Sequence, residues 1–317
     1  MLQRMVGSHS EIFTHPEPHL MTPLAHLGYF DNVEKASYDH INAAKAMREF
    51  VDGLPNAEQD YVDACRSYSD TLYGRMLETT ESSHFLDKTP AYALITDFVS
   101  RLYPQAKYIT LTRHPLAILS SYANSFFEGD YKRAYAFNPI LDRYVPAIAK
   151  FIRQAEVPQL HVRYEDVVGD PEAHLKKIFT FMGLEDEPEA VNYGQHKHIK
   201  KSYGDPKVDD NQRPVTASVA KWAKELAGDA EKLAIARGIV SGLDPRDLEA
   251  WGYPIETLFD ALEEARGGDT SGLAKEPINA YRIQRKILLR LRDNIHENRF
   301  GKTVKAVRYY CDVLLRD

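Results

Sequence analysis

Short β-rich runs alternate with longer amphipathic segments through the middle of the chain. Runs rich in β-branched and aromatic residues predict three strands, at His84–Leu86, Tyr108–Thr112 and Gln159–Arg163. Apolar residues at helical spacing predict helices near Tyr92–Leu102, Pro115–Phe127, Pro139–Gln154 and Pro171–Met182. Strands that alternate with helices are typical of a parallel sheet with right-handed crossovers. The pattern therefore predicts an α/β fold with a central parallel sheet flanked by helices.

Two further regions are predicted to be helical without strands. Residues 31–81 show apolar positions at three- and four-residue spacing, with Pro55 between two helical stretches, and we expect a helical insert there. Closer to the C-terminus, glycines among polar residues predict a linker over 266–280. We therefore expect a main domain over 1–265, this linker, and a helical extension over 281–317.

The C-terminal extension combines apolar stripes with a basic charge. Apolar residues recur at helical spacing on both sides of Gly301, and residues 281–317 hold ten Lys/Arg against four Asp/Glu. These features suit a docking or membrane-surface element, or a helical hairpin packed on the main domain or on a second copy in a homodimer. We favour packing, because burial is the usual reason for an amphipathic stripe.

Composition narrows the class of protein. The formal net charge of −6 over 317 residues argues against a general nucleic-acid binder. No run approaches the roughly 20 apolar residues of a membrane span. Cys65 and Cys311 are the only cysteines, so no disulfide framework is implied, and we expect a cytoplasmic protein.

The stretch over 107–122, KYITLTRHPLAILSSY, holds the clearest candidate site. Arg113 directly follows a predicted strand, and Pro115 suits the first turn of the helix after it, with Ser120 and Ser121 one or two turns further on. Ligands of open α/β sheets bind at the carboxyl ends of strands, so an arginine and a hydroxyl placed in this way can converge on one anion. An ordinary strand–helix joint with a surface arginine explains the same spacing.

Four segments in order resemble a single family. Arg113, eight positions before Ser121, resembles the 3′-phosphate-binding motif of sulfotransferases that use 3′-phosphoadenosine 5′-phosphosulfate (PAPS). Three other blocks resemble the same family: HFLDKTPAY (84–92), LHVRYEDVVGDPEAHLKKIFTFMGL (160–184) and YGDPKVDDNQRPVTASVAKW (203–222). The resemblance covers roughly residues 1–255. It implies a P-loop-like sulfotransferase fold and transfer of sulfonate from PAPS to a hydroxyl group, with no metal required.

The resemblance also implies roles for individual residues. Arg113 and Ser121 would bind the 3′-phosphate of PAPS, while Arg213 and Lys221 in the late block would contact the nucleotide. Lys88 matches the family lysine that approaches the transferring sulfonate, where a cation neutralises charge growing on the bridging oxygen. A solvated lysine after a strand is the alternative explanation of Lys88.

Glu17 and His19 are the candidate general bases. They lie in FTHPEPHLM, which resembles the family segment PPELHL, whose glutamate would take the proton of the acceptor hydroxyl. The segment departs from the family at Pro18, where leucine is usual. A loop glutamate between two prolines explains Glu17 equally simply. The nearby histidines lack any recognised metal-ligand spacing, and we expect no metal.

The start of the chain departs further from the family. Sulfotransferases of this type open with a strand and a PRSGTT-like loop, whose backbone N–H groups bind the 5′-phosphosulfate. This chain opens with MLQRMVGSHSEIF, which resembles the family only from just after that loop. We favour truncation over degeneration. Without the first strand we expect an unpaired central groove beside the strands at 84–86 and 108–112, and low stability or activity.

The implied acceptor is a hydroxyl on a small molecule, a lipid or a carrier-tethered acyl chain. The helical segment over 43–77 resembles sulfotransferase domains of bacterial polyketide assembly lines, which favours a lipophilic acceptor by analogy. Two other classes stay open. One is a non-catalytic binding or scaffold protein that kept the fold and lost the phosphosulfate loop. The other is a P-loop kinase relative, which is disfavoured because GxxxxGK[ST] is absent.

Overall fold

The computed structural model describes most of the chain. The described residues are 1–16, 21–25, 27, 40–195, 211–216, 219–266, 302–304, 306–307 and 310. The chain divides into two compact units. Unit 1 comprises Met1–Pro115, Leu141–Lys221 and Ser241–Phe259, and unit 2 comprises Leu116–Ile140, Trp222–Val240 and Asp260–Asp317. The predicted linker over 266–280 and most of the predicted extension over 281–317 lie outside the described residues.

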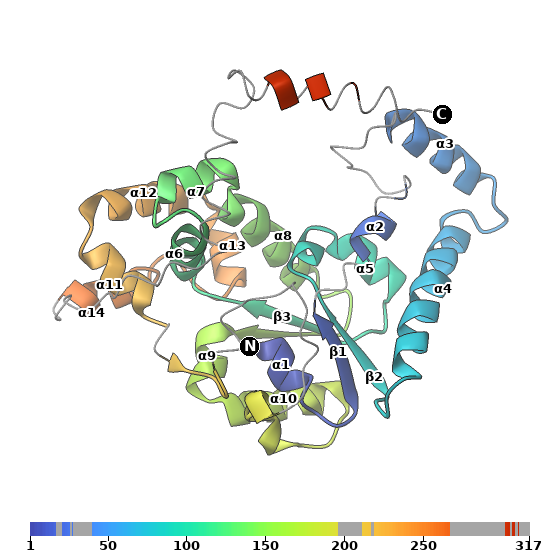
Figure 1. The fold of residues 1–317 in the computed structure, drawn as a ribbon, viewed down its shortest axis with the longest axis horizontal. Coiled ribbons are helices and arrows are strands. Elements are labelled where there is room, and N and C mark those ends of the chain that lie inside the picture. The colour runs from blue at the N-terminus through green and yellow to red at the C-terminus, as the bar shows by residue number, and fades with distance from the viewer. Residues whose placement is uncertain are drawn as a thin grey trace. The chain divides into compact units, whose positions relative to one another are not determined.

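Unit 1 contains the four strands found among the described residues. They form two parallel pairs: β1 (Ile12–Pro16) with β2 (His84–Lys88), and β3 (Tyr108–Thr112) with β4 (Gln159–Arg163) (Figure 1). The predicted strands at 108–112 and 159–163 are confirmed, and the third runs two residues further than predicted. The α/β class with parallel strands is thus confirmed, whereas β1 was not among the strands that the pattern predicted.

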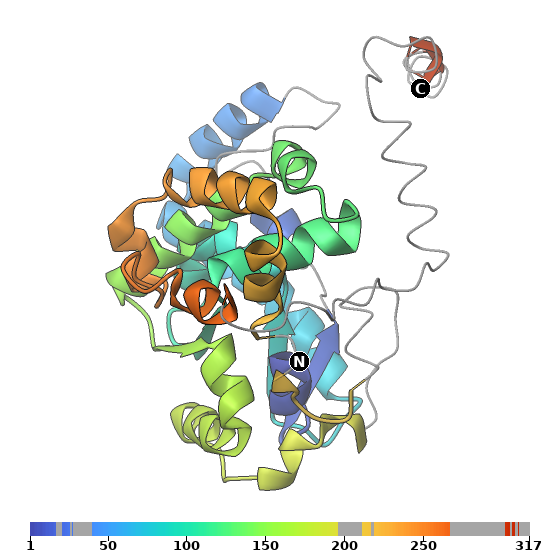
Figure 2. The same cartoon turned by 90° about the vertical axis from the view of Figure 1, so that its left-hand side faces the viewer.

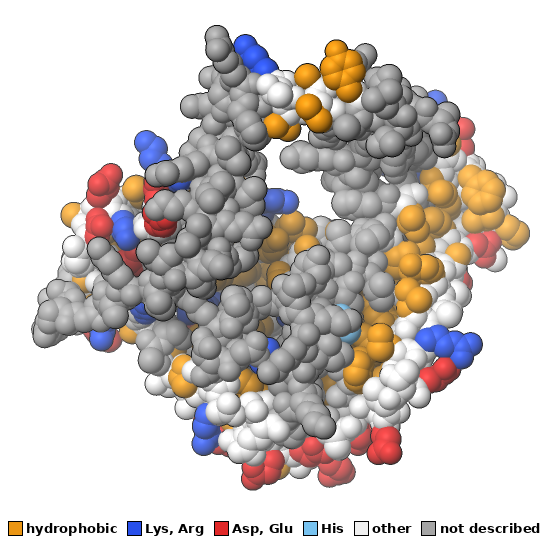
Figure 3. All heavy atoms as spheres, in the orientation of Figure 1, with side chains coloured by type: hydrophobic (Ala, Val, Ile, Leu, Met, Phe, Trp, Pro, Cys, Tyr) orange, Lys and Arg blue, Asp and Glu red, His pale blue; other side chains and the backbone are white. Residues whose placement is uncertain are grey.

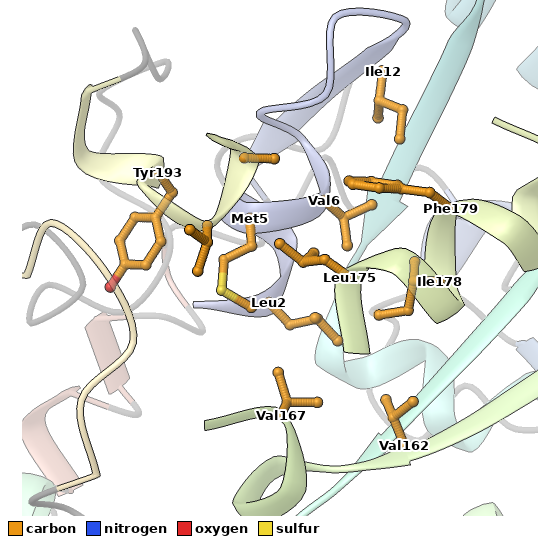
Figure 4. Packing of buried hydrophobic residues seen from close by; sticks show 12 residues of the cluster. Leu2, Met5, Val6, Ile12, Val162, Val167, Leu175, Ile178, Phe179 and Tyr193 are labelled. Carbon is orange, nitrogen blue, oxygen red and sulfur yellow. The ribbon is translucent and has the colours of Figure 1, made fainter. Parts of the chain in front are cut away.

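The two strand pairs are not hydrogen-bonded to each other. Among the described strands, β2 pairs only with β1 and β3 only with β4. A shared core nevertheless covers both pairs. Figure 4 shows this cluster, in which side chains of α1 (Leu2–Val6) and α10 (Pro171–Met182) pack together with Ile12 of β1 and Val162 of β4. One hydrophobic layer therefore joins the two pairs in unit 1.

Helices are found within the region of the predicted helical insert, of which residues 31–39 lie outside the described part of the chain. Its two longer helices are α3 (His40–Asp52) and α4 (Glu58–Leu77), and Pro55 lies between them. Their inner faces contribute buried residues to a second core of unit 1, together with α2 (Met21–Ala25) and α5 (Thr96–Leu102). Figure 3 shows hydrophobic side chains gathered over α3 and α4 as well, and those exposed include Phe50, Tyr68, Leu72 and Met76.

The remaining helices of unit 1 differ from the predicted ones at their ends. The helix predicted near Tyr92–Leu102 is two elements, a 3-10 helix η1 (Pro90–Leu94) and α5, with Ile95 between them. By contrast, α10 has the predicted bounds, because Asp170 caps its start and Gly183, at φ 81°, ends it. The others are α8 (Ile140–Gln154), α9 (Tyr164–Gly169), η2 (Pro188–Val191), η3 (Tyr193–Gln195) and α13 (Pro245–Ala250).

The described part of unit 2 is helical. It contains α7 (Tyr131–Phe137), α12 (Ala230–Val240), α14 (Asp260–Arg266) and nearly all of α6 (Pro115–Phe126) and α11 (Lys221–Ala227). Figures 1 and 2 both show α12, in orange, beside α7, in green, and these two helices pack against each other. α6 starts at the proline that the sequence places in its first turn.

The described residues lack two kinds of feature. None of their helices is both long enough and apolar enough to pass through a membrane. They also contain no cluster of three or more His, Cys, Asp or Glu side chains arranged to hold a metal ion.

Candidate functional site

Arg113 lies in a turn of unit 1. Its side chain and its backbone carbonyl are each held by a different aromatic residue. It follows the carboxyl end of β3 directly. Its guanidinium carbon lies 4.4 Å from the ring centroid of Tyr164, the first residue of α9, and its carbonyl oxygen accepts a 2.9 Å hydrogen bond from the indole N–H of Trp251. A cation–π contact of this kind contributes about 0.5–2 kcal/mol. The side chain thus has a defined direction at a strand end, as anion binding requires.

His114 is neutral at physiological pH, which leaves Arg113 as the cation of this turn. Burial lowers the pKa of His114 to about 4, and the positive charges of Arg113 and Arg163 act in the same direction. Nε2 of His114 lies 3.0 Å from the carbonyl oxygen of Leu258. Since a carbonyl only accepts, this nitrogen carries the proton and donates.

Glu165 connects the turn to the segment after α13. Its Oε1 accepts a 3.2 Å hydrogen bond from the backbone N–H of His114, and its Oε2 accepts one from the hydroxyl of Tyr253. Burial, with the Glu165 carboxylate, raises the pKa of Tyr253, so this hydroxyl stays protonated. The ring of Tyr253 also lies edge-on to that of His114, with centroids 5.3 Å apart. Glu165 and Tyr253 thus hold the His114 part of the turn, in addition to the contacts that hold Arg113.

The same late segment lies against the end of β4. Arg163 forms two 2.9 Å hydrogen bonds with Asp166 and a 3.1 Å bond from Nη1 to the carbonyl oxygen of Gly252. Gly252 has φ +90°, and a Cβ there would lie 3.1 Å from Arg163 Cδ and from His161 Cε1. A side chain at this position would therefore be both strained and crowded, and the glycine lets the chain pass close to the strand.

Ser120 and Ser121 take different environments on α6. Ser120 is buried and donates a 2.6 Å hydrogen bond to Glu225, whereas Ser121 is exposed. The exposed hydroxyl is therefore that of Ser121, which lies eight positions after Arg113 in the sequence. Ser121 belongs to unit 2 and Arg113 to unit 1.

Lys88, the candidate cation for sulfonate transfer, is the last residue of β2 and is half-buried. The preceding Asp87 accepts hydrogen bonds through Oδ2 from the hydroxyls of Tyr73, at 2.5 Å, and Tyr92, at 3.1 Å. Burial raises the pKa of both tyrosines, that of Tyr92 to about 12, with a further contribution from the Asp87 charge. Two protonated tyrosines thus hold the carboxylate next to Lys88.

Glu17 and His19 lie outside the described residues, but the positions on either side of them are described. In the parallel pair, Pro16 at the end of β1 lies opposite Lys88 at the end of β2. Gln3 donates a 3.0 Å bond to the carbonyl of His15, and the backbone N–H of Met21 donates a 3.1 Å bond to the hydroxyl of Tyr92. The described residues on either side of positions 17–20 are thus Pro16, which lies opposite Lys88, and Met21, which is bonded to Tyr92.

The two late candidates are at the surface. Arg213 is exposed and forms a 2.8 Å ion pair with Glu172 of α10. Such exposed pairs contribute only about 0–1 kcal/mol, so an anionic ligand can compete for this arginine. Lys221 is exposed at the first position of α11.

Several residues of these networks were missed by reasoning from sequence. Tyr164 and Glu165 stand inside the quoted block over 160–184, but spacing assigned them no role. Trp251 and Tyr253 contact the Arg113–His114 turn across more than 130 positions, which no local pattern reveals. One local signal could have indicated them. Trp251 and Tyr253 flank Gly252 just after α13, and such a pattern is expected where the chain packs closely on other elements.

Comparison with known proteins identifies relatives of this chain. A model of the sulfotransferase family matches residues 1–188. Nodulation protein NoeE of Sinorhizobium fredii (strain NBRC 101917 / NGR234) is 25% identical over 253 residues, which cover 71% of this chain and 57% of NoeE. The chain thus spans little more than half the length of this relative.

Two solved structures were also found to be similar. The sulfotransferase domain from the curacin biosynthetic pathway is 23% identical, with a TM-score of 0.49, covering 75% of this chain and 92% of that domain. The sulfotransferase domain from the Synechococcus PCC 7002 olefin synthase is also 23% identical with a TM-score of 0.49, covering 77% and 90%.

Proposed function

This chain belongs to the sulfotransferase family, and we propose that it transfers a sulfonate group from PAPS to a hydroxyl group of an acceptor. The observation that carries the proposal is the Arg113 turn. A strand-end arginine whose guanidinium rests on the ring of Tyr164 and whose carbonyl is bound by Trp251 is a preorganised cation. Guanidinium groups held in this way suit phosphate, which they bind through several charge-assisted hydrogen bonds.

The residues would divide into a nucleotide-binding set and a reacting set. Arg113 and the exposed Ser121 hydroxyl bind the 3′-phosphate, with Arg213 and Lys221 as outer contacts to the nucleotide. An arginine, a lysine and a hydroxyl are the group types that phosphate takes as partners, so the chemistry of these side chains fits the nucleotide. Contacts to Tyr164 and Trp251 hold Arg113, and Ser121 is exposed on α6. Arg213 and Lys221 are exposed as well.

The reacting set comprises Glu17 or His19, and Lys88. PAPS supplies a sulfonate that is attacked in line by the acceptor oxygen, while the bond from sulfur to the bridging phosphate oxygen breaks. Glu17, or His19 in its place, takes the proton from the attacking hydroxyl. Lys88 neutralises the negative charge that grows on the bridging oxygen. This division is supported by the pairing of Pro16 with Lys88, because Pro16 directly precedes Glu17 in the sequence and lies opposite the last residue of β2.

We further propose that the acceptor is lipophilic, as a hydroxyacyl chain or a lipid would be. The supporting observation is the run of exposed apolar side chains on α3 and α4, which includes Phe50, Tyr68 and Leu72. Large exposed apolar groups gathered on one surface are uncommon unless something binds there. Sulfonate transfer to a β-hydroxyacyl thioester, measured beside transfer to a sugar hydroxyl, tests this part of the proposal. Faster transfer to the sugar would contradict it.

The experiment on the nucleotide site is calorimetry with adenosine 3′,5′-bisphosphate. We expect the unaltered protein to bind it, and Arg113→Ala to weaken binding about tenfold or more, since a charge-assisted hydrogen bond contributes about 1.5–3 kcal/mol. ATP with magnesium serves as the control ligand for a kinase-like site. Binding of ATP–magnesium in place of the bisphosphate would overturn the proposal, and bisphosphate binding without any sulfonate transfer from PAPS would indicate a scaffold.

A further inference from the structure

A buried carboxylate lies at the centre of unit 2. Glu225 of α11 is 8% exposed and is surrounded by hydrogen-bond donors from three other parts of the unit. Its Oε2 accepts from Ser120 at 2.6 Å, from Asn124 at 2.8 Å and from Tyr131 at 3.2 Å. Its Oε1 accepts from Lys232 Nζ at 2.6 Å. One side chain of α11 thus binds α6, α7 and α12 together.

Stability alone is a weak reason for such a group. A buried ion pair loses hydration, and apolar residues of similar volume often serve a core equally well or better. What a buried, fully bonded carboxylate provides instead is a defined geometry, because each donor has to point at one of its two oxygens. The Glu225 network should therefore fix how its helices are oriented.

The two donors on α6 fix the rotation of that helix about its axis. Ser120 and Asn124 are one turn apart on the same face, and both point at the same oxygen of Glu225. Successive residues of an α-helix are rotated by about 100°, so Ser121 cannot share that face. It is exposed, in agreement with this geometry.

The turn after α6 is shaped around the same network. Gly129 has φ +83°, and a Cβ there would lie 3.0 Å from Asn124 Oδ1 and 3.0 Å from Lys232 Nζ. A side chain at position 129 would thus be strained and would press on two residues that bind Glu225. The ammonium group of Lys232 also lies 5.4 Å from the ring centroid of Tyr131. The surroundings of Glu225 therefore leave little freedom for a different arrangement.

We propose that Glu225 is a positioning residue for binding of the 3′-phosphate: it holds α6 in the rotation that presents the Ser121 hydroxyl to the nucleotide. The proposal rests on the proposed function, since it assigns a support to the Ser121 contact. Glu225 is buried among its own partners and acts on the ligand only through Ser121.

The test is Glu225→Gln, which keeps the shape of the side chain but replaces one oxygen by an NH₂ group that cannot accept. Calorimetry compares adenosine 3′,5′-bisphosphate with adenosine 5′-monophosphate, which lacks the 3′-phosphate. We expect affinity for the bisphosphate to fall about three- to tenfold, within the range of one hydrogen bond, and affinity for the monophosphate to stay the same. Asp130→Asn, the same acid-to-amide change at the N-cap of α7, is the matched control and should change neither.

A double-mutant cycle with Ser121→Ala separates positioning from general stabilisation. If Glu225 acts through Ser121, then Glu225→Gln has no further effect once the hydroxyl is gone. Equal losses for both nucleotides, or additive losses in the double variant, would overturn the proposal. Should Glu225→Gln fail to fold, Ser120→Ala removes one donor only and carries the same expectations with a smaller loss.

Failure of the inference can be distinguished from failure of the proposed function. If the unaltered protein does not bind the bisphosphate, both are wrong. If it binds, and Ser121→Ala weakens binding while Glu225→Gln and Ser120→Ala do not, the nucleotide site stands and the positioning role of Glu225 is rejected.

Discussion

Arg113 and Ser121 are eight positions apart in sequence, yet they belong to different compact units and are held by different kinds of contact. The Arg113 turn is surrounded by aromatic rings and by hydrogen bonds to its backbone, and the neighbouring His114 is kept neutral by a lowered pKa. Ser121 lies on a helix that a buried carboxylate holds in place. Each of the two proposed phosphate-binding residues therefore depends on a separate support.

Much of this support comes from beyond the part of the chain that matches the family model, which ends at residue 188. Trp251 and Tyr253 hold the Arg113 side, and Glu225 and Lys232 hold the Ser121 side. The matched region carries Arg113 and Ser121, the two residues proposed to bind the 3′-phosphate, while later segments support the turn and the helix on which they lie. Changes in those later segments should therefore alter binding even at positions that never touch a ligand.

The largest effect is expected from removing the aromatic support. Trp251 is 4% exposed, so Trp251→Ala should lower the free energy of unfolding by about 4 kcal/mol through lost packing and a cavity. Trp251→Phe, which keeps most of the packing but loses the indole N–H, should cost about 1 kcal/mol. Urea unfolding measures both. Equal losses in the two variants would show that the hydrogen bond to Arg113, and not packing, dominates this side.

The next effect concerns the charged support of unit 2. Lys232→Met leaves the buried Glu225 carboxylate without its ion-pair partner, and the free energy of unfolding should fall by about 3 kcal/mol. Adding Glu225→Leu to this variant removes the unpaired charge and should restore much of the loss. If the double variant is no more stable than the single one, the lost stability comes from packing and not from the unpaired charge. The view that Ser121 depends on a charged support, unlike Arg113, is then wrong.

A smaller effect is expected in the pH dependence of the free energy of unfolding, through His114 beside Arg113. The folded-state pKa of His114, about 4, is below its unfolded value of 6.5, so the unfolded chain binds more protons between these pH values. Stability is therefore fully present above pH 6.5 and is lost as pH falls toward 4, by about 2 kcal/mol between pH 7 and pH 5. Denaturant unfolding across this range measures the slope. His114→Gln, which can still donate to Leu258, should flatten it, and an unchanged slope would assign the effect to other groups.

The elements that sequence predicted well are those whose signals are local. The strands at 108–112 and 159–163 and the helix over 171–182 have the expected bounds, because apolar runs, a first-turn proline and a terminal glycine act within a few residues. β1 was missed because IFTHP mixes polar residues and a proline into five positions, and its pairing with β2 bridges more than 70 residues. Propensity cannot report a partner so distant in sequence.

In the candidate site, too, some residues could be predicted from local sequence and others could not. Spacing and resemblance selected Arg113 and Ser121, and the structure adds that Ser121 is exposed while Ser120 is buried. The supports at Tyr164, Glu225 and Trp251 depend on packing between distant segments and could not be inferred from spacing. The roles of all the candidate residues remain predictions, those of Arg113 and Ser121 as well as those of Glu17, His19, Lys88, Arg213 and Lys221.

The smallest effect is expected at Tyr164, whose ring lies 4.4 Å from the guanidinium carbon of Arg113. Tyr164→Leu removes the ring and should weaken adenosine 3′,5′-bisphosphate binding about threefold, since an exposed cation–π contact contributes about 0.5–1 kcal/mol. Tyr164→Phe keeps the ring and should bind like the unaltered protein. In an Arg113→Ala background the leucine variant should have no further effect, because the ring acts only through the arginine. A loss in the phenylalanine variant equal to that in the leucine variant would mean that the Tyr164 hydroxyl, and not its ring, supports this side of the site.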